Sequence, residues 1–556
     1  MARPTHDEVL KQFMDELLAA EQAWQPHLRK FRHNYDVYLN SDKKKREEET
    51  KGRLFVHHAY QQIETIVPRM VAPDPRFELD PRDGQSHDQV IALQRKIDYD
   101  LEVDRFVEKQ VDLAKTALIS GVTVAKVIWD KRTTKVKQHN YNADPMDILR
   151  GVEPAVIETT RVDRNGPSMI PVNLSDFFPE PGPTSISSMN HVFHRVWLTE
   201  DELMARKELT DSNGKPVFKN ILKALRTPRG SDNSQHLPNE SSEDIEGRRG
   251  NRYEVIERWK KNRLTVVVNR SIVIRDQENP YWHGEIPFVD ACSQPDIRSF
   301  VGISEVEVIE NIVKMIHKFE NLRIRAAEFA INPVLKINSG LRGGQNFEWR
   351  PGAHLFLDRP DQVQPETAPA NLAAAWDEVQ AYLGYMQQVS GVSPFIAGAD
   401  PGAAGVNQET ATGASILQAE ANKRLALKLM QMQNMYSKVA KFFVQLNQQY
   451  MVKNELVRIS GPEGNNWVEI TPQDIAGNYD VRASNSTESL SRNAEVQRLT
   501  DAVNTLMPMQ GIQMADGTVV DLKYPLRSLL QSIGVDADKC FAQAPPPQPM
   551  MENPNG

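Results

Sequence analysis

The sequence predicts an α+β protein, in which helices and strands occupy separate stretches of the chain. The first half mixes helical segments with short β-branched runs, whereas long segments of helical periodicity dominate the second half. The 556 residues are enough for roughly three to four domains. We therefore expect several hydrophobic cores along the chain.

The N-terminal part is expected to be helical. Apolar residues in 6–39 recur at the spacing of an amphipathic helix. Two further helical stretches, 53–70 and 87–119, flank the turn-rich segment 73–84. In the run 43–49, adjacent lysines and glutamates cancel each other's field, which predicts a solvated helical face rather than a nucleic-acid patch.

A β-rich tract follows the first helices. The alternating, β-branched segment 121–129 predicts a strand. Segments 155–162 and 168–173 are expected to form a hairpin across 163–166, because Asn-Gly favours a tight turn. A meander of three more strands is expected at 253–259, 264–268 and 271–275.

Polar residues separate these strands. Thr199 and Glu202 fit a capping box, which predicts a short helix ending near Glu208. Segment 227–250 has almost no apolar residues and is expected to be an exposed loop. The polar turn 211–214 lacks the ladder of oxygen ligands that a calcium loop requires.

The second half begins with a predicted helical hairpin. Ser304 can cap a helix that extends to Ala330, and a second helix is expected over 371–390. The insert between them is rich in glycine and proline, with strand candidates at 334–338 and 354–358. This pattern predicts two antiparallel helices joined by a small β-rich cap.

A glycine-rich segment, 391–411, separates the hairpin from a very long helix. The helical pattern over 412–451 covers 40 residues, a length typical of a bundle, a coiled coil or an assembly. Strands are expected next at 455–460, 467–471 and 479–484, then helices near 488–507 and 521–533. The proline-rich tail is expected to be disordered.

Composition excludes several functional classes. The net charge of −8 disfavours a protein that coats DNA. Apolar runs are far shorter than the roughly 18 residues of a membrane span, and no secretory signal is visible. Cys292 and Cys540 are too few for a disulfide framework or a zinc cluster, so we expect synthesis in a reducing compartment.

Familiar catalytic motifs are missing from the sequence. It contains no phosphate-binding P-loop, nucleophile elbow or zincin motif. The histidine pairs His57/His58 and His191/His194 lack carboxylate or thiol neighbours at the spacing of metal ligands. We therefore expect no enzyme, no cofactor and no metal, while a catalytic site assembled from distant positions stays open.

Two segments carry a family resemblance. The sequence PVNLSDFFPEPG at 171–182 resembles an aspartate-aromatic-proline strand common in portal proteins, the head-to-tail connectors of tailed bacteriophages. The stronger match is 389–425, where a glycine-rich loop leads directly into a long helix. This junction is similar to that of short-tailed phage portals.

The resemblance implies an architecture and a function. By position, the chain would comprise a mixed wing (1–303), two stem helices (304–330 and 371–390), a clip (331–370), a tunnel loop (391–411), a long wing helix with returning strands (412–484), a crown (485–540) and a disordered tail (541–556). Portals form dodecameric rings at one capsid vertex of the virion, after assembly in the host cytoplasm. Their partners are the terminase motor, the tail adaptor, the major capsid and scaffolding proteins, and the double-stranded DNA that passes through.

Candidate site residues follow from these positions. Channel-facing cations would be Lys314, Lys318, Arg323, Arg325, Lys423 and Arg424. Tunnel-loop residues would be Pro394, Phe395, Ile396, Gly398, Asp400, Gly402, Gly405 and Asn407. Partner-binding residues in the clip would be Arg342, Trp349, Arg350 and Phe356.

Each assignment has an alternative. The stem cations could instead form pairs between subunits, with Glu305, Glu310, Glu320 or Glu328. Trp349 and Phe356 could fill the small β core, and Phe395 with Ile396 could anchor the loop on a neighbouring subunit. For the whole chain, the alternative is an oligomeric virion scaffold or adaptor without a DNA channel.

Overall fold

The computed structural model describes most of the chain. The described residues are 6–41, 53–71, 76–82, 87–139, 156–210, 214–227, 252–331, 334–337, 363–366, 372–392, 411–461, 464–484, 499–500, 503–504, 507 and 526. The chain divides into two compact units, one of Met1–Val71 with Phe77–Ala483 and one of Ala72–Arg76 with Ser484–Gly556. The helices and sheets discussed below lie in the first unit, apart from the strand-end residues Arg76 and Ser484.

The N-terminal helices largely follow the predicted pattern. The helix expected over 6–39 is α1 (His6–Leu39), and α3 (His58–Met70) follows it. The single stretch expected over 87–119 is wrong, because it is two helices, α4 (His87–Val103) and α5 (Phe106–Ser120). Arg105 adopts a left-handed backbone with φ of 51°, which breaks the helix between them.

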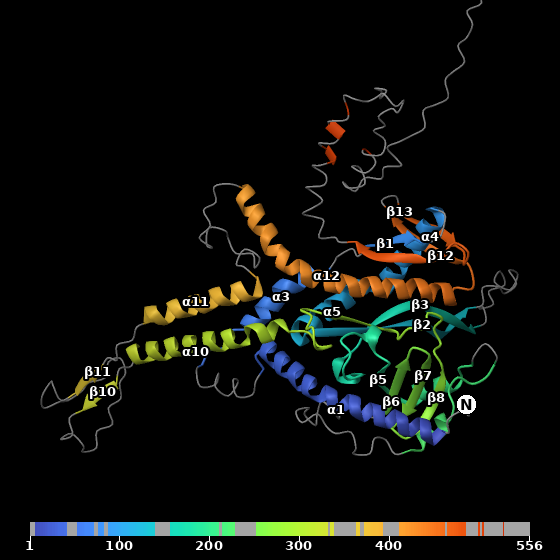
Figure 1. Cartoon of the computed structure of the whole chain (residues 1–556), viewed down its shortest axis with the longest axis horizontal. Helices are drawn as coiled ribbons and strands as arrows, with labels where there is room; N and C mark the ends of the chain where they lie inside the picture. Colours follow the sequence, from blue (N-terminus) through green and yellow to red (C-terminus); the bar gives the residue numbers. More distant parts are fainter. Residues whose placement is uncertain are drawn as a thin grey trace, which may run out of the picture. The chain divides into compact units, whose positions relative to one another are not determined.

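A five-stranded antiparallel sheet lies against α1 (Figure 1). Its strands, in spatial order, are β4 (Phe177–Pro179), β5 (His191–Leu198), β6 (Tyr253–Lys260), β7 (Arg263–Val268) and β8 (Ile272–Glu278). Phe13 of α1 packs edge-on against Phe193 of β5, with ring centroids 5.2 Å apart. The predicted three-strand meander is confirmed, and Asn269 and Arg270 turn between β7 and β8 with positive φ.

A second sheet has the order β3-β2-β9. Its strands are β2 (Val122–His139), β3 (Val156–Pro171) and β9 (Phe288–Cys292). The hairpin turn expected at 163–166 is wrong, because β3 continues through this segment. Gly166 and Asn165 pair with Asp130 and Lys131 of the long strand β2, and Asp163 is the extra residue of a bulge.

Short elements complete this part of the chain. The capping box predicted at Thr199 and Glu202 is confirmed at the start of α7 (Glu200–Lys207). The remaining short helices are η1 (Leu174–Asp176), η2 (Ile186–Ser188) and α8 (Ile221–Leu225). Two-stranded sheets join β1 (Arg76–Pro81) to β14 (Tyr479–Ser484) and β12 (Glu455–Gly461) to β13 (Gly464–Ile470).

The predicted helical hairpin is α10 (Glu305–Ile331) and α11 (Leu372–Ser390), which lie side by side in Figure 1. Beyond them, β10 (Val334–Ile337) pairs antiparallel with β11 (Val363–Glu366). The strand candidate at 354–358 lies outside the described residues, and β11 was not expected. The predicted long helix is α12 (Ala411–Tyr450).

The buried apolar side chains of these helices and strands form two hydrophobic clusters. The larger one joins the sheets to α1, α3, α4, α5 and much of α12. The smaller one fills the hairpin with Ile309, Val313, Ile316, Val379 and Met386, together with Ala59 of α3. Among the described residues, no helix is both long and apolar enough to cross a membrane.

Candidate stem and junction site

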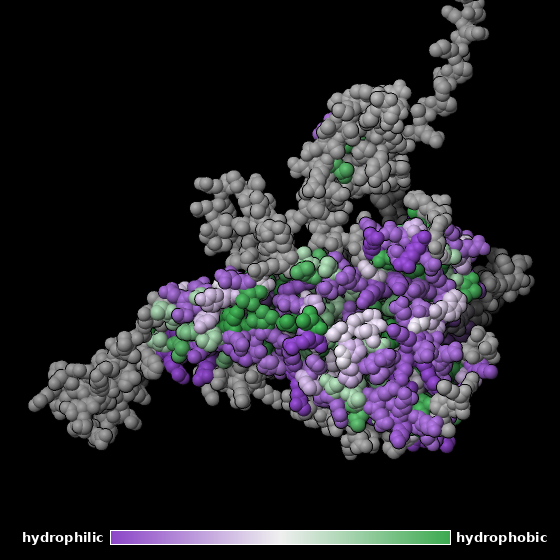
Figure 2. All heavy atoms as spheres, viewed as in Figure 1, coloured by the Kyte–Doolittle hydropathy of each residue, from purple (hydrophilic) through white to green (hydrophobic). Residues whose placement is uncertain are grey.

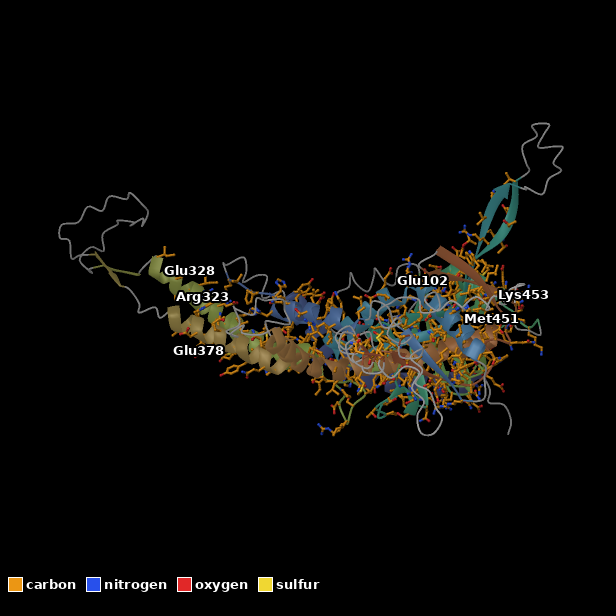
Figure 3. The ribbon with its side chains drawn as sticks, turned by 90° about the horizontal axis from the view of Figure 1, so that it is seen from above. Glu102, Arg323, Glu328, Glu378, Met451 and Lys453 are labelled. Atoms are coloured by element: carbon orange, nitrogen blue, oxygen red, sulfur yellow. The ribbon has the colours of Figure 1, made fainter. Side chains whose placement is uncertain are left out.

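Aromatic and apolar contacts fix the α10–α11 hairpin. Ile316 is fully buried between the helices, and Phe319 stacks on Tyr382 with centroids 5.6 Å apart. Farther from the sheets, the Arg323 guanidinium lies 4.8 Å from the ring centroid of Trp376 (Figure 3). The hairpin therefore has one buried seam between its two helices, and the first part of α10 also packs against α1 and α3.

The start of α10 is tied to the rest of the chain by Ser304. Its Oγ accepts a hydrogen bond from the Val306 backbone N–H at 3.1 Å, which confirms the predicted cap. The same hydroxyl is 2.6 Å from the Ile119 carbonyl oxygen at the end of α5. One buried side chain thus caps α10 and connects it to α5.

A close backbone approach shapes the same junction. Gly121 has φ of 84°, and a Cβ there would lie 2.3 Å from the Gly302 carbonyl oxygen. A Cβ at Gly302 would lie 2.4 Å from the Gln294 carbonyl oxygen. Only glycine fits both positions without moving the backbone, so α5, β9 and α10 meet at a fixed point.

A buried ion pair joins α10 to α12. Lys428 Nζ lies 2.6 Å from Glu305 Oε1, and only 8% and 2% of the two side chains are exposed. Glu305 also accepts hydrogen bonds from Ser293 Oγ at 3.1 Å and Gln294 Nε2 at 2.8 Å. This arrangement holds the long helix against the first turn of α10.

The candidate channel cations do not share one environment. Lys314, Lys318 and Arg325 are exposed on α10, at positions that repeat on the face away from α11. Arg323 instead lies against Trp376, so it belongs to the seam between the helices. Lys423 lies on α12 with Arg424, but the side chains of both are outside the described residues.

Three of the proposed glutamate partners, Glu305, Glu310 and Glu320, have contacts within the same chain. Lys314 Nζ is 2.5 Å from Glu310 Oε1, and His33 Nε2 of α1 is 2.6 Å from the same oxygen. Burial raises the pKa of Glu310, but hydrogen bonds from Lys314 and His33 outweigh it and hold the pKa below its ordinary value. Among the described residues, no ion pair to Lys318 or Arg325 occurs.

The tunnel-loop and clip candidates lie outside the described residues. They are Pro394, Phe395, Ile396, Gly398, Asp400, Gly402, Gly405 and Asn407 in the loop, and Arg342, Trp349, Arg350 and Phe356 in the clip. Their assignments stay predictions.

Sequence reasoning missed the long-range contacts of the junction. Lys428 was not singled out, because its partner Glu305 is distant in sequence and the i,i+4 spacing of helix pairs gives no signal for it. The Gly121–Gly302 approach was also missed, although a glycine directly after an apolar helix is a recognisable C-terminal signal.

His194, one of the histidines considered above as metal ligands, contacts a glutamate instead. His194 of β5 lies opposite Glu257 of β6 in the five-stranded sheet, with the ring Nδ1 3.9 Å from the carboxylate, and burial lowers the pKa of His194 despite that carboxylate. Among the described residues, no group of three or more histidine, cysteine, aspartate or glutamate side chains could hold a metal ion.

Comparison with known families gives one match over almost the whole chain. The family model described as Phage SU10 portal protein matches residues 10–553. The match includes both segments that carry the resemblance, the hairpin, and the helix that follows it.

Proposed function

Because the chain belongs to the Phage SU10 portal protein family, we propose that it forms the ring through which the phage genome is packaged and ejected. In this proposal twelve copies surround the channel at one capsid vertex. The terminase motor docks on the ring during packaging, and a tail adaptor replaces it afterwards. The family match across 10–553 is the observation that carries the proposal.

The domain roles are part of the same proposal. Residues 1–303 would form the wing, 304–330 and 371–390 the stem, and 331–370 the clip. Residues 391–411 would form the tunnel loop, and 485–540 the crown. In the clip, Arg342, Trp349, Arg350 and Phe356 would contact the motor and then the adaptor, since arginine and tryptophan are enriched at interface hot spots.

The exposed surface of the hairpin and of α12 supports a role in assembly. Apolar side chains that are about half exposed or more occur there, and Figure 2 shows hydrophobic residues gathered over this part of the chain. They are Leu322, Tyr385, Val389, Leu427 and Met430. Such residues are expected to be covered by a neighbouring subunit.

The charge of α10 supports a channel that holds DNA only weakly. Duplex DNA carries one charge per about 1.7 Å, and a protein that contacts 6–10 phosphates binds it with a strong dependence on salt. Lys318 and Arg325 provide a small number of exposed cations per subunit, on a chain of net charge −8. A few rings of positive charge would guide the duplex without stopping its movement.

The experiment compares K318A/R325A with K219A/K223A, which removes two exposed cations from the segment at α8. We expect both variants to form rings, and only K318A/R325A to change the amount of DNA packaged per particle. Equal packaging by both variants would contradict the channel assignment. Particles from the unaltered chain that assemble without a central opening would favour a scaffold or adaptor instead.

A further inference from the structure

Strands β2 and β3 extend well beyond the sheet that contains them. β9 pairs with β2 only over Val122–Lys126, whereas β2 and β3 remain paired as far as His139 and Val156. Residues 131–139 and 156–163 therefore form a two-stranded ribbon, here called the arm. Figure 3 shows these blue-green strands projecting away from the other helices and strands.

Among the arm's described side chains, none is buried. Val156 and Val162 are 59% and 54% exposed. On the neighbouring positions of the same face, Lys137 and Glu158 are 73% and 65% exposed and form a solvent-exposed ion pair at 3.7 Å. An isolated two-stranded ribbon is at best marginally stable in water, so this length of exposed ribbon is expected to pack on another surface.

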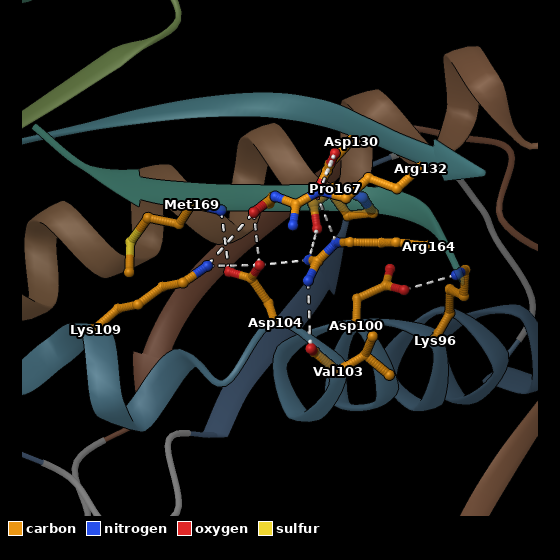
Figure 4. Close-up of polar contacts among 11 residues, drawn as sticks. Lys96, Asp100, Val103, Asp104, Lys109, Asp130, Arg132, Arg164, Pro167 and Met169 are labelled. Carbon is orange, nitrogen blue, oxygen red and sulfur yellow. Dashed lines mark hydrogen bonds and ion pairs between the residues drawn. The ribbon is translucent and has the colours of Figure 1, made fainter. Parts of the chain in front are cut away.

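A buried charge cluster fixes the base of the arm (Figure 4). The side chain of Asp104, which is fully buried between α4 and α5, pairs with Arg164 of β3 and with Lys109 at 2.7 Å. Its oxygens also accept hydrogen bonds from Ser168 Oγ at 2.7 Å and from the Met169 backbone N–H at 3.0 Å.

The same charge cluster also fixes the direction in which the arm leaves the sheet. Arg164 also donates to the carbonyl oxygens of Pro167 and Val103, so one guanidinium joins the arm's strand to the end of α4. Buried, multiply hydrogen-bonded charges tolerate little displacement. The arm therefore leaves the sheet in a defined direction, as a docking element requires.

The arm is positively charged on a negatively charged protein. It contains five cations and two carboxylates, while the whole chain has a net charge of −8. The cations are Lys131, Arg132, Lys135, Lys137 and Arg161, and the carboxylates are Glu158 and Asp163. The strand register places Lys135 and Lys137 on the same face as Val156 and Val162.

A complementary surface lies where α4 ends and α5 begins. Val103 and Val107 are 44% and 37% exposed there. Glu108 is 72% exposed and lies 3.9 Å from the exposed guanidinium of Arg105. Asp112, one turn farther along α5, is also exposed. This surface thus offers two valines beside two carboxylates, against the two valines and two lysines of the arm.

We propose that the arm of one subunit docks on the α4–α5 surface of the next subunit in the ring. The two surfaces are different patches of one chain, and contacts of this head-to-tail kind close into rings when the rotation permits. Lys135 and Lys137 would pair with Glu108 and Asp112, and the valines would be covered. The proposal rests on the ring-forming function proposed above.

A charge exchange in the full-length chain tests the contact. The variants are K135E/K137E, E108K/D112K and the combination of all four changes, with K219E/K223E as the matched control. We expect each arm or α5 variant to raise the concentration needed for half-assembly about tenfold, because like charges would face each other. The combined variant should recover most of this loss, and the control should match the unaltered chain. Native mass spectrometry reports the fraction of chains in rings.

The outcomes separate the arm contact from ring formation itself. If the unaltered chain forms rings and K135E/K137E assembles equally well, the arm contact is wrong and the ring stands. If K135E/K137E and E108K/D112K both lose rings but the combination of all four changes does not recover them, the proposed charge pairing is also wrong. If K135E/K137E forms normal rings but loses affinity for duplex DNA, the arm binds nucleic acid instead. An unaltered chain that forms no rings overturns both proposals.

Discussion

The buried pair between Lys428 and Glu305 gives the sharpest prediction about the junction. In K428M, a side chain of similar length replaces the lysine, and Glu305 keeps its charge at a site that is 2% exposed. Removing one partner of a buried ion pair typically costs about 3–5 kcal/mol. Glu305 retains hydrogen bonds from Ser293 and Gln294, and it lies in the first turn of α10, where the helix dipole favours a negative charge. We therefore expect a loss of about 2–4 kcal/mol in the free energy of unfolding.

The same helix supplies the control for this measurement. In K441M, the lost pair is Lys441 with Glu285 at 3.4 Å, and about half of each side chain is exposed. Exposed pairs contribute at most about 1 kcal/mol, so K441M should unfold at nearly the same urea concentration as the unaltered chain. The double variant K428M/E305Q should recover part of the loss, because it removes the unpaired charge. Equal losses in K428M and K441M, or no recovery in the double variant, would refute the reasoning.

Three further changes test other parts of the fold. D104N should lower the free energy of unfolding by about 3–5 kcal/mol and speed amide hydrogen exchange in 156–171, because Arg164 loses its buried carboxylate. Unchanged exchange would show that the cluster does not hold the arm. In H283F, the free energy of unfolding measured with urea should depend less on pH. Burial lowers the pKa of His283 to about 4 in the folded chain, where its Nδ1 accepts the Glu285 N–H, whereas the unfolded chain binds this proton below about pH 6.5. The unaltered chain should therefore lose about 1 kcal/mol of stability between pH 7 and 5. Parallel pH profiles for the two chains would contradict that assignment. I316D places a charge in the fully buried seam and should abolish rings in electron micrographs, whereas intact rings would contradict the assignment of α10 and α11 to the stem.

Long periodic segments were predictable from the sequence alone. Helices α1, α10 and α12 bury apolar residues at helical spacing over many turns, so local pattern and tertiary packing agree. The meander of β6, β7 and β8 was predictable for the same reason, since β-branched runs alternate with short turns.

The errors occur where distant contacts override local preference. The Asn165-Gly166 pair favours a turn, but β3 stays extended there because β2 supplies a full set of pairing partners. The helix break at Arg105 was not predictable, because the buried contacts of the adjacent Asp104 come from β3 and α5. The β2 partners of β3 and the β3 partners of Asp104 are distant in sequence, and only Lys109 lies near Asp104 along the chain.

The candidate site was predictable only in outline. Spacing alone places Lys318 and Arg325 on one exposed face of α10, as the structure has them. The same spacing does not show that Arg323 lies against Trp376, since that contact depends on the relative rotation of two helices. Pairing across the chain, as between Lys428 and Glu305, likewise requires the folded arrangement.

A reconstruction of the purified full-length chain by electron cryomicroscopy, without imposed symmetry, tests the central claim most directly. The account predicts a closed ring of about twelve copies, with an axial opening and the α10–α11 hairpins of adjacent subunits arranged around it. The arm of each subunit should contact the α4–α5 surface of its neighbour. A monomer, a dimer, or a closed assembly without an axial opening would contradict the proposed role as a conduit for DNA.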